Sequence, residues 1–309
     1  MKGFDLLHHN ISPAVALVLA GLTSIPSNAR SQNAPAAAAN WSGVEQVLGR
    51  KGTMNPGGVV KFGFPRSDLS VRLDDVTIKP ALALGGWAAF KGNPNGQATV
   101  MGDLVLLENE VAPVMTALQA GGVEQTAVHN HLVREEPHLL YMHIHARGNA
   151  QSIARTIRDA LARTKTPLAA SPAASAGSPA ELDTVAIKSA LRVAGKWNGG
   201  VYQVGVPRRE KITEDGMEVP PSMGVATSIN FQPTGGGKAA ITGDFVLREN
   251  EVNPVIRALR DNGIEVTALH THMLTEQPKL YFMHFWANDD ARKLARGLSI
   301  ALNRTASKR

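Results

Sequence analysis

Two short windows of the sequence, at residues 129–145 and 270–284, hold eight of the ten histidines in the chain. Both windows contain a His-x-His pair, a glutamate four residues later, and a further histidine eight residues after that glutamate. Three neutral imidazoles and one carboxylate form a donor set that suits a divalent transition metal such as zinc, copper, manganese or iron. The spacing therefore predicts a metal site in each window, formed by His129, His131, Glu135 and His143 and by His270, His272, Glu276 and His284.

The first window has the pattern of two strands joined by a short loop. Side chains alternate between the two faces of a strand, so the odd-numbered positions carry the imidazoles and the even-numbered positions are mostly apolar. We expect a hairpin in which His129 lies opposite His143 and His131 lies opposite Tyr141. A slip of one residue would mix the two faces, so the pattern itself favours this parity.

The two windows differ at two of their histidines. Lys279 stands where the first window has His138, and Trp286 stands where it has His145. His138 falls in the predicted loop, and the substitution of His145 predicts a narrower second site. Four ring side chains of the imidazole face are predicted to contact a bound ligand, namely Tyr141, His145, Phe282 and Trp286.

The windows belong to a longer duplication. Residues 102–143 align without a gap on residues 243–284, with 23 identities in 42 positions. A period of this length indicates a duplicated domain and not a solenoid repeat. We expect the following organisation: a signal peptide (1–29), a disordered mature N-terminus (30–39), repeat unit one (40–164), an Ala/Ser/Pro linker (165–180) and repeat unit two (181–305).

Each repeat mixes strand and helix patterns. Val111, Val114 and Leu118 follow helical spacing, as do Ile153 and Ile157 later in the repeat, and runs of strand character surround the first of these helices. The predicted fold class is α+β, with an antiparallel sheet and helices on one face in each repeat, and a pseudo-two-fold relation between the repeats.

Several acidic residues recur at the same place in both repeats. The "ENE" segments, with Glu108 and Glu110 in the first repeat, precede helices and are predicted to cap them. Asp103 and Asp244 each follow a glycine, and we interpret them either as turn residues or as hydrogen-bond partners of imidazoles.

The composition excludes several classes of protein. The chain has no cysteine, which excludes disulfides, thiolate metal sites, a cysteine nucleophile and a lipid-modified cysteine. The net charge is +6, but the basic residues form no run and aromatic residues make up only 5% of the chain, so a nucleic-acid partner is not expected. A small molecule or a cell-envelope ligand remains open as a partner, and the sequence gives no oligomeric state.

The N-terminus has the features of an export signal. Lys2 precedes an apolar run at residues 11–25, which is short for a membrane span, and small residues follow at 27–29. We expect cleavage there, a periplasmic or secreted location, and no transmembrane segment in the mature chain. An uncleaved anchor and a buried helix are the alternatives.

The paired blocks "GD-V-ENEV-P" and "HxHxxxE-P…MH" resemble the LppY/LpqO family of exported bacterial proteins, whose shared domain has no known function. The resemblance covers most of the mature chain, once per repeat, and implies an exported, duplicated domain without naming a reaction. Some members look like lipoproteins, whereas this chain lacks the cysteine for lipidation. The His-x-His-x3-Glu spacing also looks like the metal motif of cupin barrels, but the helices between the strands argue against that fold.

Three functions are compatible with these patterns. The first is an exported metal-binding protein, of which a metal-dependent enzyme with Glu135 or Glu276 as general base is one form. The second is a non-catalytic module that binds a cell-envelope ligand in pockets lined by histidines and aromatic residues. The third is a structural protein in which the two histidine faces bury each other between the repeats.

Overall fold

The computed structural model describes residues 40–93, 96–169 and 182–309. The predicted signal peptide and mature N-terminus lie outside the described residues, as does most of the predicted linker. Residues 37–309 form one unit in space, so both repeats belong to the same body. Within the described ranges, no helix is long and apolar enough to cross a bilayer.

The first repeat folds into a six-stranded sheet with the order β1-β2-β5-β6-β8-β7, in which all neighbours are antiparallel. A separate two-stranded sheet joins β3 and β4. The elements of the first repeat are α1 (Ser42–Leu48), β1 (Thr53–Asn55), β2 (Val59–Pro65), β3 (Val71–Leu73), β4 (Val76–Ile78), α2 (Pro80–Ala83), β5 (Gly85–Gly92), β6 (Ala98–Leu107), α3 (Glu108–Ala120), β7 (Glu124–His129), β8 (Leu139–Gly148) and α4 (Ala150–Leu161).

The second repeat has the same strand order, β9-β10-β13-β14-β16-β15, again with antiparallel neighbours. A small sheet joins β11 and β12. The elements of the second repeat are α5 (Thr184–Leu191), β9 (Lys196–Asn198), β10 (Val201–Pro207), β11 (Thr213–Glu214), β12 (Met217–Glu218), η2 (Pro221–Met223), β13 (Ala226–Gly235), β14 (Lys238–Leu247), α6 (Glu249–Arg260), β15 (Glu265–His270), β16 (Tyr281–Asp290) and α7 (Ala291–Leu302). The predicted fold class is confirmed.

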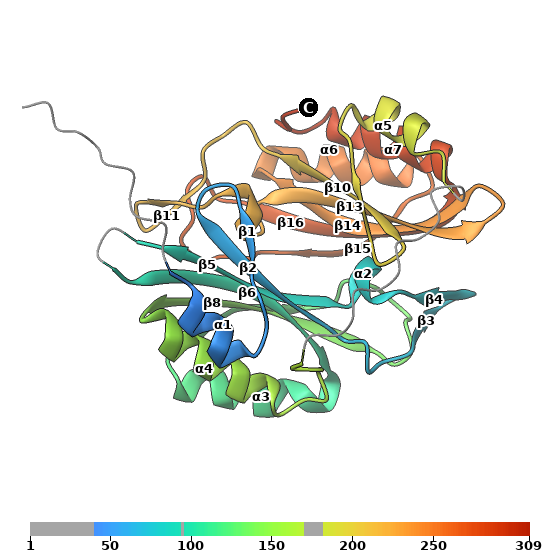
Figure 1. The fold of residues 1–309 in the computed structure, drawn as a ribbon. Helices are drawn as coiled ribbons and strands as arrows, with labels where there is room; N and C mark the ends of the chain where they lie inside the picture. Colours follow the sequence, from blue (N-terminus) through green and yellow to red (C-terminus); the bar gives the residue numbers. More distant parts are fainter. Residues whose placement is uncertain (1–39, 94–95, 170–181) are drawn as a thin grey trace, which may run out of the picture. The chain divides into compact units, whose positions relative to one another are not determined.

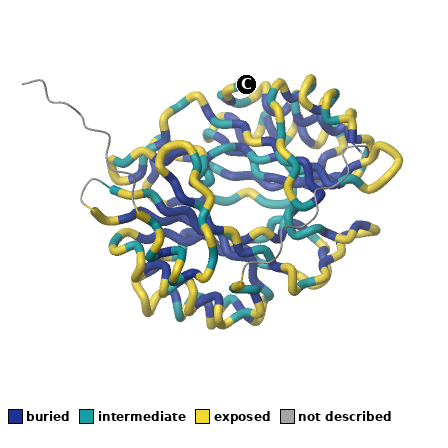
Figure 2. The backbone as a smooth tube through the Cα atoms, in the orientation of Figure 1, coloured by how far each residue is buried: buried dark blue, intermediate teal, exposed yellow. Residues whose placement is uncertain are grey.

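The main helices of each repeat cover the outer face of its sheet, and the inner faces of the two sheets face each other (Figure 1). Apolar side chains fill the space between helices and sheet in each repeat, around Phe62 and Phe90 in the first and Phe231 and Phe285 in the second. Figure 2 shows the buried segments following the strands of both sheets, while exposed segments lie on the outer helices and loops. Two further apolar clusters combine residues of both repeats and hold the inner faces together.

Two hydrogen bonds between the repeats form an equivalent pair. The Thr126 hydroxyl donates to the carbonyl of His272 at 2.6 Å, and the Thr267 hydroxyl donates to the carbonyl of His131 at the same distance. Thr267 is the counterpart of Thr126, and His272 is the counterpart of His131. A contact in which each partner uses the same surface is the mark of a two-fold relation.

The repeated "ENE" segments cap helices, as predicted. Glu110 accepts a hydrogen bond from the backbone N–H of Leu107 at 2.9 Å, which satisfies a donor at the start of α3. The same carboxylate pairs with the fully buried Arg66 at 2.6 Å. Glu251 repeats both contacts, with the N–H of Arg248 and the guanidinium of Arg208.

The predicted hairpin register is wrong by two residues. In the structure His129 lies opposite Tyr141, and Ala127 lies opposite His143. The reason is that β7 ends at His129, so His131 belongs to the connecting loop, and an irregularity between Gln125 and Ala127 adjusts the pairing. An even shift leaves the faces unchanged, so the predicted imidazole face is retained.

Candidate metal centre

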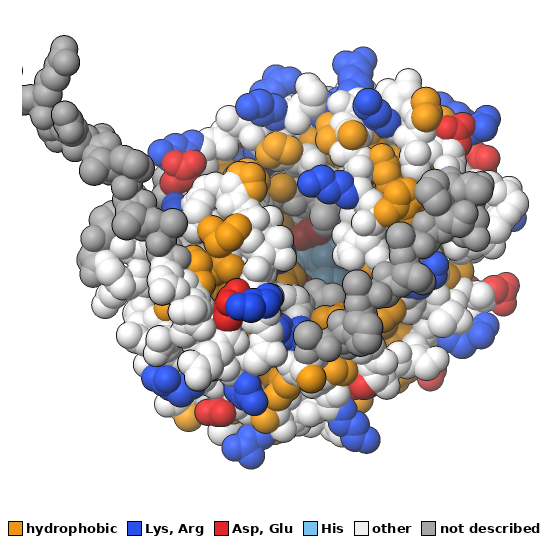
Figure 3. Space-filling view, viewed as in Figure 1, with side chains coloured by type: hydrophobic (Ala, Val, Ile, Leu, Met, Phe, Trp, Pro, Cys, Tyr) orange, Lys and Arg blue, Asp and Glu red, His pale blue; other side chains and the backbone are white. Residues whose placement is uncertain are grey.

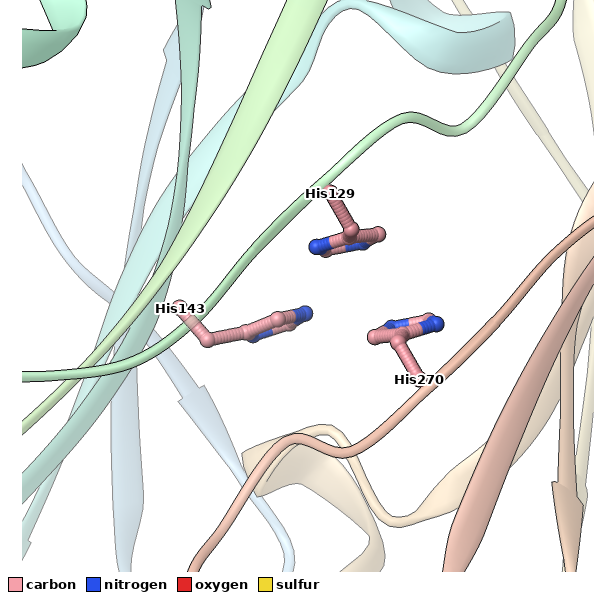
Figure 4. Close-up of side chains that lie close together, drawn as sticks. All are labelled: His129, His143 and His270. Atoms are coloured by element: carbon pink, nitrogen blue, oxygen red, sulfur yellow. The ribbon is translucent and has the colours of Figure 1, made fainter.

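Histidines of both repeats converge between the two sheets. The rings of His129 and His270, which are counterparts, stack with centroids 3.7 Å apart and planes 16° apart. Figure 4 shows these two rings with that of His143, all directed into the same space from strands of different repeats. The cluster as a whole consists of His129, His131, His143, His270, His272 and His284. The two histidine windows therefore meet in one shared cluster.

The closest contacts cross the boundary between the repeats. The ring centroids of His131 and His284 are 3.9 Å apart, and those of His143 and His272 are 3.8 Å apart. The Nε2 atoms of His129 and His284 are separated by 3.3 Å. The second histidine of each His-x-His pair thus lies against the last histidine of the opposite repeat.

Backbone carbonyls orient the rings. The Nδ1–H groups of His143 and His284 donate to the carbonyls of Gly102 and Gly243, at 3.3 Å and 2.7 Å. Such a bond fixes the tautomer and leaves the Nε2 lone pair free to bind. A Cβ atom at Gly243 would collide with the carbonyl oxygen of Ser228, which explains why glycine occupies this position. His272 is oriented in the same way by the carbonyl of Gly224 at 3.1 Å.

Two aspartates supply the carboxylates of the cluster. Asp103 and Asp244 lie on β6 and β14, directly opposite His143 and His284 in the sheet register. An oxygen of Asp103 lies 3.4 Å from Nε2 of His131, while an oxygen of Asp244 lies 2.9 Å from Nε2 of His272. Burial raises the pKa of Asp244 to about 6.

Burial also keeps the histidines uncharged. Burial lowers the pKa of His143 and His272 to about 3. For His129, His131 and His270, burial and the charge of neighbouring imidazoles act together and lower the pKa still further. These five rings are therefore neutral at pH 7, with lone pairs available.

Many polar atoms of the cluster are buried without a hydrogen bond. Both ring nitrogens of His270 are in this state, and so is one carboxylate oxygen of each aspartate. The others are Nδ1 of His129 and the Nε2 atoms of His131, His143 and His272. An unsatisfied buried polar group typically costs about 1–3 kcal/mol, so a concentration of them calls for a bound species.

The geometry of the donor atoms suits a metal ion. Three groups of side chains have ligand atoms within 4.8 Å of one another. They are His129, His143 and His270; His129, His131 and His284; and Asp244, His270 and His284. Five of the eight predicted metal ligands, all of them histidines, belong to these groups, and the ring of His272 lies beside them against His143.

The two predicted glutamate ligands have other partners. Glu135 accepts a hydrogen bond from the N–H of Leu139 at 3.1 Å and contacts His138 at 3.2 Å. Glu276 likewise accepts from the N–H of Leu280 at 2.9 Å. Among the described residues neither glutamate belongs to the three groups, and both hold the loop that precedes the last strand of the repeat. The carboxylates that do lie beside the histidines are those of Asp103 and Asp244, and the repeated "GD" dipeptide was their signal in the sequence.

The predicted ligand-contact residues separate into two sets. Tyr141 stacks on His131 with centroids 3.3 Å apart, and Phe282 stacks on His272 at 3.4 Å, so both rings support the cluster. His145 instead faces Glu124 and Glu214, each at 3.4 Å. Trp286 is buried in one of the apolar clusters between the repeats.

A hollow leads toward the histidines from one face of the molecule, where histidine and acidic surface is visible at its floor (Figure 3). Trp87 lies close to the cluster, since a Cβ atom added at Gly224 would be 3.0 Å from its ring and 3.7 Å from Nδ1 of His272. The Nζ atom of the half-buried Lys61 lies 3.7 Å over the Trp87 ring centroid. Burial lowers the pKa of Lys61 to about 8.

Fold and site together define a duplicated α+β protein with a buried histidine–aspartate cluster between its repeats. The chain belongs to the family described as Domain of Unknown Function (DUF1259), which matches residues 42–163 and 185–304. No curated protein matches the chain.

Two solved structures are similar to the chain at low identity. EtuB from Clostridium kluyveri is 9% identical over 82% of this chain and 88% of its own, with a TM-score of 0.18. A trimeric bacterial microcompartment shell protein, PduB, is 10% identical over 81% of this chain and 90% of its own, with a TM-score of 0.19. Likeness at this level carries no argument about fold or function.

Proposed function

We propose that this protein is an exported protein that binds divalent transition metal in the cluster between its repeats. The proposal is carried by the donor set of the cluster: several buried ring nitrogens lack hydrogen bonds, and three groups of side chains each have ligand atoms within 4.8 Å of one another. Structural imidazoles normally satisfy both nitrogens, whereas metal ligands keep one lone pair free.

The donor atoms favour one class of metal. Imidazole nitrogen suits zinc, copper and iron, and mixed imidazole and carboxylate sites also take manganese, whereas calcium and magnesium prefer oxygen alone. The chain has no cysteine, so no thiolate competes for the ion. The carbonyls of Gly102 and Gly243 orient two of the imidazoles, as partners of metal-binding histidines commonly do.

Metal analysis of untagged full-length protein tests this function. We expect wild-type protein reconstituted with zinc, copper, manganese or iron to retain metal after desalting, and His129→Ala/His270→Ala to retain none. His138→Ala is the matched control, because this histidine is exposed and lies outside the cluster. A wild-type chain that retains none of the four metals would refute the proposal and favour a metal-free ligand-binding module.

Export is the second part of the proposal, and it rests on residues 1–29 and on the resemblance to the LppY/LpqO family. Expression of the full chain in a bacterium with two membranes, followed by fractionation and intact-mass measurement, tests it. We expect a chain shortened by about 29 residues in the periplasm or medium, the number following from the position of the small-residue cleavage pattern. Leu17→Arg/Leu19→Arg, which interrupts the apolar run, should keep the chain at full length inside the cell. Full-length wild-type protein in the cytoplasm would contradict export.

A further inference from the structure

We infer that the cluster holds two metal ions, each bound across the repeat boundary, an inference that rests on the proposed metal-binding function. One ion is bound by the His-x-His pair of the first repeat and the last histidine of the second. The other is bound by the reciprocal set. The two ligand sets, termed site A and site B, are His129, His131, His284 and Asp103 for site A, and His270, His272, His143 and Asp244 for site B.

The pseudo-two-fold relation supports two equivalent sites. In site A the ring centroids are 5.0 Å apart for His129 and His131, 3.9 Å for His131 and His284, and 5.3 Å for His129 and His284. The corresponding separations in site B are 5.0, 3.8 and 5.6 Å. The ring triangles are nearly equal on the two sides. Among the described residues the three histidines of site A have ligand atoms within 4.8 Å of one another, whereas Asp244 of site B forms such a group with His270 and His284.

Distances between donor atoms in site A match those around one ion. Two ligands at about 2.0–2.1 Å from a tetrahedral ion are about 3.3–3.4 Å from each other. The Nε2 atoms of His129 and His284 are 3.3 Å apart, and Nε2 of His131 is 3.4 Å from the Asp103 oxygen. A cation bound among these four atoms would account for both short distances without a hydrogen bond between the atoms of either pair.

The number of donors exceeds what one ion takes. Six imidazoles and two carboxylates surround the pseudo-two-fold axis, whereas zinc-type sites use four ligands. A single ion would leave about half of these buried groups unsatisfied. Among the described residues, moreover, neither Asp103 nor Asp244 forms an ion pair with lysine or arginine, and of the two only Asp103 interacts with a nearby cationic side chain, that of Lys61.

The backbone that carries the ligands is also tied across the boundary. Thr267 of the second repeat holds the carbonyl of His131, and Thr126 of the first repeat holds the carbonyl of His272. Asn130, next to His131, donates to the carbonyl of Thr267 at 3.0 Å. These contacts position His131 and His272 against the last histidine of the opposite repeat, at 3.9 and 3.8 Å between ring centroids. His129 and His270 also stack on the last histidine of their own repeat, at 5.0 and 4.8 Å.

Pairs of substitutions separate cross-repeat sites from one site in each repeat. Zinc per full-length chain is measured after reconstitution and desalting, with circular dichroism to confirm folding. We expect two zinc ions in the wild type. His131→Gln/His284→Gln removes two ligands of site A and should retain one ion, as should the mirror pair His272→Gln/His143→Gln for site B.

The matched pair takes both residues from one repeat. His131→Gln/His143→Gln removes one ligand from each site and should retain no zinc. Retention of one ion by this pair, with none in His131→Gln/His284→Gln, would overturn the inference in favour of one site in each repeat. One ion per wild-type chain would also overturn it while leaving the metal function standing, and no metal in the wild type would defeat the function itself.

Discussion

The two repeats present the same histidines to the centre but surround them differently. In the first repeat Lys61 lies over Trp87 beside the cluster. The corresponding positions of the second repeat are Gln203 and Ser228, as the equivalent strand pairings show. Gln203 donates to the carbonyl of Ala81 at 2.8 Å and so serves the contact between the repeats.

The two repeats thus agree in the histidine cluster itself and differ in the residues beside it. The histidines and aspartates of the cluster, the carbonyls of Gly102 and Gly243 and the helix caps are repeated. The amine and indole beside the cluster occur on one side only. Duplication therefore preserved the parts that must be symmetric and released the surroundings to differ.

The largest expected effect tests the repeated ion pair. Glu110→Ala leaves the buried guanidinium of Arg66 without its main partner, and Glu251→Ala does the same to Arg208. Breaking a buried pair in this way typically costs about 3–5 kcal/mol. Urea unfolding should show equal losses for the two variants, and the exposed Glu108→Ala should change little. A large loss in only one repeat would show that the repeats are not structurally equivalent.

Removal of one carboxylate at a time tests the symmetry of the centre. Asp103→Asn and Asp244→Asn each replace a charged oxygen beside an imidazole by a neutral amide. We expect metal affinity to fall by at least roughly 10–100-fold in both variants, because altering a group that only orients a ligand already costs this much. Competition with a chelator measures it. The same substitution at Asp68, which pairs with Arg66 and lies outside the cluster, should leave affinity unchanged.

Acid should destabilise the metal-free protein through its neutral histidines. The pKa of His143 and of His272 is about 3 in the folded chain, against about 6.5 when unfolded. Between these values the unfolded state binds more protons, so stability falls as pH drops below about 6.5, by up to ~1.4 kcal/mol per pH unit for each group.

Asp244 opposes this trend, because its pKa is raised to about 6 in the folded chain. Between that pKa and the lower pKa of an aspartate in the unfolded chain, the folded state binds one proton more, so this group adds stability as the pH falls. Urea unfolding at pH 7, 6 and 5 measures the net slope, which His143→Gln/His272→Gln should reduce. A wild-type slope of zero would mean that these rings are charged or solvated in the folded chain.

The smallest expected effect concerns the side that is not repeated. The pKa of Lys61 is lowered to about 8, so the unfolded state binds more protons between about 8 and the ordinary lysine value near 10.4. Stability should therefore rise slightly with pH across this range. Lys61→Met should abolish that rise, and Gln203→Met should not. Thermal midpoints from pH 7.5 to 10.5 provide the measurement, and identical profiles for all three proteins would contradict the assigned burial of the amine.

Local sequence patterns predicted the fold class and the imidazole faces, because alternation and helical spacing follow from backbone geometry alone. They also excluded His138 from the predicted metal site, and in the structure this histidine lies in the loop and contacts Glu135. The register was missed by two residues, since where β7 ends depends on the fold of the loop that follows. Spacing within one window could not show this.

The sequence left the aspartates and the cross-repeat contacts open for a different reason. Asp103 and Asp244 were interpreted as turn residues or as partners of imidazoles, and burial of the two histidine faces against each other was one of three alternatives. Asp103 meets His143 through the pairing of β6 with β8, which are separated along the chain by a helix and another strand. His131 meets His284 only because two sheets dock face to face. Neither contact leaves a periodic signal in the sequence, whereas Glu135, four residues from His131, has an obvious spacing and turns to the loop backbone instead.

The reciprocal threonine bonds between the repeats have an evolutionary consequence. A contact in which each half gives and receives the same bond is one that two separate copies of a single-repeat chain would also make. A homodimer of such an ancestor would already contain all the histidines and aspartates of the centre. In a single chain that carries both halves their stoichiometry is fixed, and the residues beside the centre can differ between the halves, as Lys61 and Gln203 do.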